Sequence, residues 1–264
     1  MRLPVLLLLL SLPNLLAAQV GPSMADVAIT LAPKTTLPLQ QRIAFAYFLE
    51  DPAGTAEQLG RYENIEVDSV AGDHLLLSIT PGSRYAGAVL EDYRRGSFVI
   101  DLEEDSTAGF VEEFRRSAGS DWQLLDLEAH VNAYVTDPTY VNGFDIASVV
   151  ASTRSGDCTE YAVLLAALAR AMGLPARVMI GTVVMASEKE VRAAGHAWTE
   201  VWQDDAWHSL DAALHQIPAK QRYYVPVMPL EDEGPSYAFS LMYMTAHMAT
   251  RISGVHSAAA PDKR

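Results

Sequence analysis

The pattern of apolar and polar positions is strand-like in the first part of the chain. Residues 26–105 hold short alternating or aromatic-rich segments that are separated by Gly, Pro and Asp. The alternation over 64–80, with a Gly-Asp turn in its middle, predicts a hairpin, and 97–102 reads as a further strand. We therefore predict a mostly β accessory domain of the sandwich type over residues 26–106.

The pattern changes to helical periods after residue 106. Amphipathic helices are predicted over 107–117, 121–135 and 146–153, because apolar residues recur there every three or four positions. The segment 177–185 is almost continuously apolar, which is typical of a strand buried on both faces. Helices and strands together indicate that this part of the chain is of the α+β class.

A further helix has both of its ends marked. The apolar run 163–172 follows Gly-Asp-Cys-Thr-Glu and stops at Gly173. Asp157 is a good N-cap, and Glu160 three residues later completes a capping box. Cys158, the single cysteine, then occupies the first helical position. Because unpaired N–H groups at a helix N-terminus favour an anion, we expect a lowered pKa for this thiol and a binding place for an oxyanion.

A base and its orienting group are predicted downstream on one hairpin. Residues 195–202 and 207–211 have strand composition and flank the polar turn 203–206, while the polar segment before them reads as a loop. His196 lies on the first strand and Asp211 at the end of the second. In either of two registers the pair shares a face, at roughly 5–8 Å between Cβ atoms, so the carboxylate can reach the imidazole. Alternatively, His196 is structural and Asp211 a turn residue.

These motifs resemble, in composition and order, the bacterial transglutaminase-like core, which belongs to the wider papain-like cysteine peptidase fold. The resemblance covers roughly residues 121–213 and rests on Gly-Asp-Cys-Thr-Glu-Tyr-Ala, Gly-Leu-Pro-Ala-Arg-Val-Met-Ile-Gly, His-Ala-Trp-Thr-Glu-Val-Trp and Trp-His-Ser-Leu-Asp. It implies an α+β core at 107–220, in which the helix bearing the cysteine packs on an antiparallel sheet. Cys158 would be the nucleophile, His196 the base and acid, and Asp211 its orienting group.

The resemblance also raises the question of what else surrounds the substrate. Members of the family often complete the oxyanion hole with an aromatic or amide side chain upstream of the cysteine. Tyr134 and Asn132 are the candidates here, beside the backbone N–H of Cys158. Trp198 and Tyr134 are candidates for lining the substrate site, although the tryptophan equally suits the core.

The remaining side chains give little support to a metal or another cofactor. His208 and His215 lie near Asp211 in sequence, but their spacing fits no zinc pattern. We therefore expect no cofactor. A formal net charge of −14 also argues against nucleic acid as a partner. The expected partner is a protein or peptide substrate, and the oligomeric state is left open.

The N-terminal residues suggest export. Arg2 and the apolar run 5–18 read as a signal peptide over residues 1–25, with cleavage after Ala18 or Ala25. The run is too short for a membrane span, and no cysteine lies near it, so no stable membrane anchor is expected. The protein would then be periplasmic or secreted. Residues 221–264 are expected to form a C-terminal extension whose end, from Gly254, is disordered.

The sequence therefore predicts an exported cysteine-dependent enzyme that acts on amide or peptide bonds. A thioester acyl-enzyme would pass its acyl group to water or to an amine. Hydrolysis is favoured over transamidation because nothing in the sequence marks an amine-donor site. The alternative is a non-catalytic periplasmic binding or assembly module that reuses the same fold.

Overall fold

A five-stranded antiparallel sheet carries the cysteine-bearing helix. The computed structural model describes residues 25–139 and 144–259. Four strands of this first sheet follow the order β1-β9-β8-β11, and β10 pairs with one end of β9. The five strands are β1 (Ala25–Asp26), β8 (Ala176–Ala186), β9 (Val191–Gln203), β10 (Ala206–Leu210) and β11 (Gln221–Pro229).

A second five-stranded sheet follows the order β2-β12-β3-β5-β4. Its strands come from both ends of the chain: β2 (Ala28–Leu31), β3 (Ile43–Phe48), β4 (Ile65–Val70), β5 (His74–Ile79) and β12 (Arg251–Ser257). The predicted hairpin is present as β4 and β5. Strand β12 lies between β2, to which it is parallel, and β3, to which it is antiparallel.

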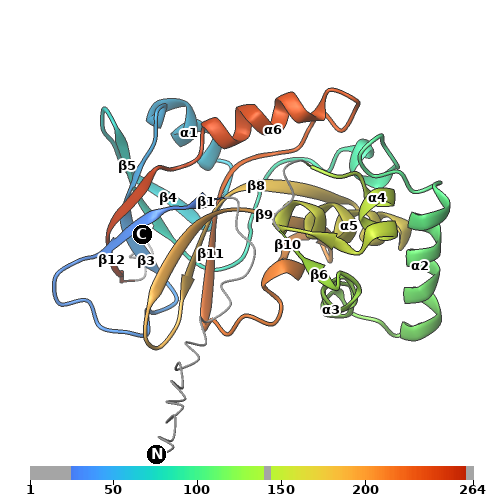
Figure 1. Ribbon diagram of the computed structural model, residues 1–264. Helices are drawn as coiled ribbons and strands as arrows, with labels where there is room; N and C mark the ends of the chain where they lie inside the picture. The colour runs from blue at the N-terminus through green and yellow to red at the C-terminus, as the bar shows by residue number, and fades with distance from the viewer. Residues whose placement is uncertain (1–24, 140–143, 260–264) are drawn as a thin grey trace, which may run out of the picture.

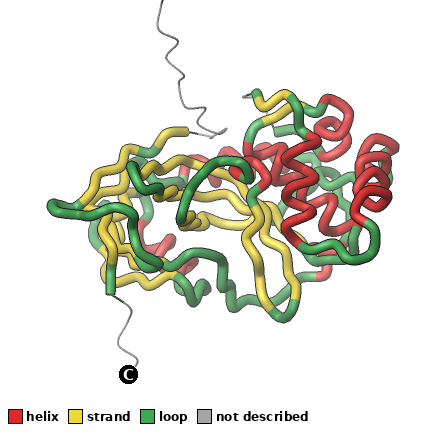
Figure 2. The backbone as a smooth tube through the Cα atoms, turned by 90° about the horizontal axis from the view of Figure 1, so that it is seen from below, coloured by secondary structure: helices red, strands yellow, loops and turns green. Residues whose placement is uncertain are grey.

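The helices gather beside the first sheet. The three predicted amphipathic helices are present as α2 (Asp105–Ala118), α3 (Leu124–Tyr134) and α4 (Ala147–Thr153), and the capped apolar helix is α5 (Cys158–Ala171). Figures 1 and 2 show α2 to α5 together at one end of the molecule and most strands at the other. Two helices were not predicted, α1 (Pro52–Leu59) and α6 (Tyr237–Ala246). The mixed composition confirms the α+β class.

Helix α5 is the centre of the helical half. It contacts β8 and β9 on one side and α2, α3 and α4 on the others. Almost every one of its side chains is buried, which explains why it is apolar all round rather than on one face. The hydroxyl of Thr199 on β9 donates to the carbonyl of Ala162 at 2.8 Å and ties the helix to the sheet. The helix is thereby held rigidly against the strand that bears His196.

The other face of the first sheet packs on the second sheet. Met179 and Val183 from β8 share one core with Ile43 and Ile252 from the second sheet. The hydroxyl groups of Tyr47 and Thr182 also lie 2.9 Å apart across this interface. Strand β8 is almost continuously apolar because α5 covers one of its faces and the second sheet covers the other.

The C-terminal part of the chain is built into both sheets. Residues 221–264 do not form an extension in the described part: β11 pairs with β8, and β12 is an inner strand of the second sheet. The expected disorder from Gly254 is wrong for residues 254–257, which belong to β12; residues 260–264 lie outside the described residues. These pairings connect segments that are remote in sequence, so no local sequence pattern predicts them.

Two local expectations also differ. Residues 97–102 form a turn instead of a strand: the Ser97 N–H donates to the carbonyl of Ile100 at 2.9 Å, and the apolar side chains of Val99 and Ile100 are buried against the helices. The polar loop expected over 187–194 is shorter, because β9 begins at Val191. Pairing with β8 extends this strand into polar sequence.

The predicted signal peptide, except for Ala25, lies outside the described residues. Ala25 and Asp26 form β1 and pair with β9. Within residues 25–139 and 144–259, no helix has the length and apolar character needed to cross a membrane.

Candidate active site

The N-terminus of α5 is built as the sequence predicted. Asp157 accepts the N–H of Thr159 at 3.0 Å, and Glu160 accepts the N–H of Asp157 at 2.8 Å, so the capping box is confirmed. Cys158 is the first helical residue. A Cβ atom added to Gly156 would lie 2.3 Å from the Cβ of Glu160, so only glycine fits immediately before the cap. The approach of the chain to Cys158 is therefore sterically fixed.

The hairpin that follows is the wider of the two expected registers. Trp202 pairs with Trp207 across β9 and β10. Asp204 and Asp205 form the two-residue turn with φ of 51° and 58°, the left-handed conformation that tight hairpins require and that aspartate tolerates. Asp211 consequently follows the last residue of β10 and caps a short 3₁₀ helix, Ala212–Leu214.

His196 and Asp211 are hydrogen-bonded in the interior. The Nε2 atom of His196 lies 2.8 Å from Oδ2 of Asp211, and both side chains are buried. The other ring nitrogen, Nδ1, is also buried and has no hydrogen-bond partner among the described residues. The predicted contact between imidazole and carboxylate is therefore present, and Nδ1 is the nitrogen left for a further group.

Cys158 lies beside β9 at a gap in the pairing of that strand. In the described residues, β1 pairs with positions 194 and 195 and β10 pairs with 199–203, which leaves the edge at Ala197 without a strand partner. Strand alternation directs the Ala197 N–H to this edge. There it donates toward the Cys158 sulfur and favours the thiolate. The hydrogen bonds of the described residues include none between the sulfur and His196, so that contact stays a prediction.

The electrostatics of the thiol differ from the expectation. Burial raises the pKa of Cys158 well above its usual value, and the charges of Asp157, Asp211 and Glu160 raise it further, while the Ala197 N–H opposes the rise. The expected lowering of this pKa is therefore wrong. The sulfur is completely buried, so desolvation and three carboxylates outweigh the attraction of a helix N-terminus for an anion.

Asp211 is held on several sides. Its Oδ1 accepts the N–H of Leu214 at 3.1 Å, its Oδ2 accepts the hydroxyl of Tyr224 at 2.8 Å, and its own N–H donates to Glu128 at 2.9 Å. Burial alone would raise the pKa of Asp211, but the charge and hydrogen bond of His196 and the phenol of Tyr224 hold it below its usual value. The carboxylate therefore stays ionised opposite the imidazole.

Sequence reasoning missed two of these partners. Glu128 is a buried acid on the inner face of α3, and its second oxygen pairs with Nδ1 of His215 at 2.8 Å. A charged residue at a buried helical position was the available signal. Tyr224 lies on β11, in the segment taken for an extension, and no local signal connected it with Asp211.

The two side chains considered for an oxyanion hole are engaged elsewhere. The hydroxyl of Tyr134 donates to the carbonyl of Ala151 at 2.8 Å, and the amide of Asn132 donates to the carbonyl of Ala212 at the same distance. The single hydroxyl proton of Tyr134 is therefore used, and Asn132 uses one of its two amide protons. The N–H of Cys158 remains the candidate for that role.

Trp198 is a core residue in this structure. Its ring is almost completely buried between the sheets and lies 4.9 Å from the ring of Tyr224. The proposed role in lining a substrate site does not match this position. Its contact instead supports the tyrosine that holds Asp211.

The histidines considered for a metal are separated by their own partners. His208 lies 3.1 Å from the carbonyl of Gln203, and His215 contacts Glu128. In the part of the chain that the structure describes, no group of three or more His, Cys, Asp or Glu side chains could hold a metal ion.

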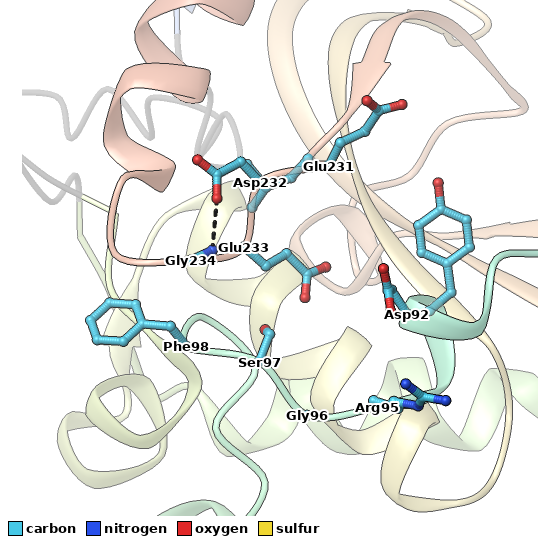
Figure 3. Close-up of a pocket in the computed structure, with 11 residues that line it drawn as sticks. Asp92, Arg95, Gly96, Ser97, Phe98, Glu231, Asp232, Glu233 and Gly234 are labelled. Carbon is cyan, nitrogen blue, oxygen red and sulfur yellow. Dashed lines mark hydrogen bonds between the residues drawn. The ribbon is translucent and has the colours of Figure 1, made fainter.

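A cavity of about 330 Å³ opens elsewhere in the molecule. Its walls, drawn in Figure 3, are residues 92, 93, 95–98 and 230–234, with four carboxylate side chains among them. Glu233 in this wall is bound by Arg170 at 2.6 and 2.7 Å, near the last turn of α5. Because Cys158 is at the first turn, roughly 18 Å away along the helix axis, this cavity is not part of the cysteine site.

Comparison with known proteins supports the reading of the central segment. The family model described as the transglutaminase-like superfamily matches residues 117–212, a segment that includes Cys158, His196 and Asp211. A protein-glutamine gamma-glutamyltransferase of Pseudomonas aeruginosa is 32% identical over 99 residues, which are 33% of this chain. The match spans only 14% of that relative.

Two solved structures are similar at lower identity. The periplasmic domain of TgpA from Pseudomonas aeruginosa is 17% identical, with 74% of this chain and 82% of that chain covered and a TM-score of 0.42. A protein from Cytophaga hutchinsonii described as a cysteine protease is 14% identical, with 66% and 72% covered and a TM-score of 0.37. On the sequence matches alone, residues 117–212 of this chain are similar to the transglutaminase-like superfamily.

Proposed function

We propose that this protein is a cysteine-dependent enzyme that acts on the carboxamide or peptide carbonyls of protein or peptide substrates. The observation that carries the proposal is the buried hydrogen bond between His196 and Asp211, beside a capped helix that opens with Cys158. A nucleophile, a base and an orienting group are the parts that covalent acyl transfer needs.

The proposed reaction begins with a neutral thiol, because burial favours the protonated form of Cys158. His196 takes the thiol proton as the sulfur attacks the carbonyl carbon. The oxyanion that forms is stabilised by the backbone N–H of Cys158. The C–N bond then breaks, and His196 returns the proton to the departing ammonia or amine. Water or a second amine finally attacks the thioester and releases the free thiol.

Asp211 fixes the tautomer of the imidazole in this scheme. Its carboxylate accepts from Nε2, so Nδ1 of His196 is the atom that exchanges the proton with sulfur. The completely buried sulfur cannot touch a substrate, so the reaction also needs the side chains over it to move. We infer that the structure corresponds to a closed resting state.

We favour hydrolysis over transamidation, since no amine-donor site is marked. Transfer to an amine is the second candidate, because the relative at 32% identity is named a protein-glutamine gamma-glutamyltransferase. The non-catalytic binding or assembly module remains the competing class. An intact arrangement of His196 and Asp211 beside a cysteine supports the enzyme.

A single assay separates these functions. The protein would be incubated with casein and a fluorescent primary amine, and released ammonia, newly formed peptide amino groups and incorporated amine would be measured. We expect ammonia release, with little amine incorporated if hydrolysis dominates. Cys158→Ala should lower kcat/KM at least roughly a thousandfold, and Asp211→Asn should lose less than His196→Ala. Ammonia release by Cys158→Ala equal to that of the wild type would end the enzyme proposal.

We further propose that the protein is exported to the periplasm or secreted. The solved domain of TgpA is described as periplasmic, and residues 1–25 have the composition of a signal peptide. Cleavage after Ala18 would keep β1 intact, whereas cleavage after Ala25 would remove half of that strand. We therefore expect a mature N-terminus at residue 19, which N-terminal sequencing of protein from the host checks. Intact Met1 in the cytosol would contradict export.

A further inference from the structure

We propose that Tyr224 is a positioning residue that holds Asp211 in the orientation in which it binds His196. The inference rests on the proposed function and extends it to β11. The hydroxyl of Tyr224 lies 2.8 Å from Oδ2 of Asp211, the same oxygen that His196 Nε2 contacts at 2.8 Å. One carboxylate oxygen is thus shared between a base and a phenol that has no other part in the reaction.

The carboxylate of Asp211 is restrained at both of its oxygens. Leu214 holds Oδ1 through its backbone N–H, and the hydroxyl of Tyr224 donates to Oδ2. Glu128 holds only the backbone N–H of Asp211. Loss of the phenol would leave the end of the side chain free to turn away from His196.

The tyrosine is itself rigid. Its backbone pairs with Val183 of β8, and its ring packs at 4.9 Å against Trp198 of β9, both in the core between the sheets. Burial and the charge of Asp211 raise the pKa of Tyr224 well above its usual value. The phenol therefore remains a hydrogen-bond donor at every pH at which an enzyme of this kind works.

The orientation of Asp211 has an electrostatic consequence. Its carboxylate stabilises the imidazolium form of His196 only while it faces the ring. Other charged and titratable groups lie around this site. Arg222 acts on Asp211, Glu128 binds the N–H of Asp211 and pairs with His215, and Asp157 and Glu160 act on Cys158. None of them changes when Tyr224 is replaced by phenylalanine, so the comparison isolates the phenol.

The test compares Tyr224→Phe with Tyr223→Phe. Tyr223 is the neighbouring buried tyrosine of β11, and its hydroxyl donates to the carbonyl of Gln40 at 2.5 Å, away from Asp211. Ammonia release from casein would be followed from pH 5 to 10. For Tyr224→Phe we expect kcat to fall roughly tenfold with KM unchanged. The acid limb of kcat/KM should move to lower pH, because a carboxylate that turns away from His196 stabilises the imidazolium form less.

A second measurement needs no turnover. In proton NMR, the imidazole N–H of His196 that faces Asp211 should move upfield in Tyr224→Phe, because the carboxylate is no longer held against it. Tyr223→Phe should leave both the signal and the acid limb unchanged. Equal kcat, acid limb and N–H shift in the two variants would overturn the role of Tyr224 and leave the proposed function standing. Absence in the wild type of both Cys158-dependent ammonia release and Cys158-dependent casein cleavage would instead reject the proposed function.

Discussion

At the scale of single residues, burial decides the state of the nucleophile. Cys158 opens a helix, a position that by itself would stabilise a thiolate. The same residue is completely enclosed and lies near three carboxylates, so the raised pKa keeps the thiol protonated at neutral pH. A resting thiol of this kind is protected from oxidation, and it becomes a nucleophile only when His196 removes its proton.

This state predicts an unusual alkylation profile. Iodoacetamide should modify Cys158 much more slowly at pH 7 than a free cysteine, and the rate should rise only above about pH 9, because the thiolate is the reactive form. Mass spectrometry of the intact protein measures the rate. In guanidinium chloride the same residue should react like an ordinary thiol. A rate in the folded protein that levels off at or below neutral pH would contradict the raised pKa.

At the scale of elements, the cap of α5 joins two segments. Glu160 accepts the N–H of Asp157 at 2.8 Å and the N–H of Asp145 at 3.0 Å, and so connects the helix to the segment before α4. Burial, with the charge of Asp157, raises the pKa of Glu160 to about 7 from 4.5. The native state therefore favours the protonated form of this side chain more than the unfolded chain does.

A pH dependence of stability follows from this shift. The stability that Glu160 contributes is fully present below pH 4.5 and is lost as pH rises through about 7. The loss is roughly 3 kcal/mol, since one pKa unit corresponds to about 1.4 kcal/mol. Urea unfolding between pH 4.5 and 8 should show a smaller decline in Glu160→Gln than in the wild type. Glu112→Gln, at an exposed position of α2, is the control. An identical decline in all three proteins would refute the assignment to Glu160.

At the scale of the whole molecule, two sheets share one core. Strand β12 lies inside the second sheet although it comes from the C-terminal part of the chain, and β11 lies against β8 in the first. The second sheet therefore supports the back of the strands that bear His196 and Tyr224. A core substitution in one sheet should accordingly lower the stability of the other sheet as well.

Ile252→Ala tests this coupling. Ile252 is completely buried on β12, and its truncation should cost about 2–5 kcal/mol of unfolding free energy. All four tryptophans lie between positions 122 and 207, outside the second sheet. The unfolding transition followed by tryptophan fluorescence should move to lower urea concentration and give an unfolding free energy that is smaller by this amount. Phe239→Ala, at a position 74% exposed, should change stability by less than about 0.5 kcal/mol. An unchanged tryptophan transition in Ile252→Ala would mean that the sheets unfold independently.

The sequence alone determined the features that depend on near neighbours in the chain. The cap of α5 is complete within four residues, and the turn between β9 and β10 is set by two aspartates. That turn brings His196 and Asp211 together although they are 15 positions apart. Helical periods and the apolar run of β8 were equally readable, because each reflects which side of one element is covered.

Only the tertiary structure decided the features that depend on remote segments. Tyr224 reaches Asp211 because β11 pairs with β8, and β12 completes the second sheet across most of the length of the chain. The pKa of Cys158 likewise depends on how completely other elements exclude water from the sulfur. Desolvation and long-range strand pairing are sums over the whole fold, and no short stretch of sequence carries them.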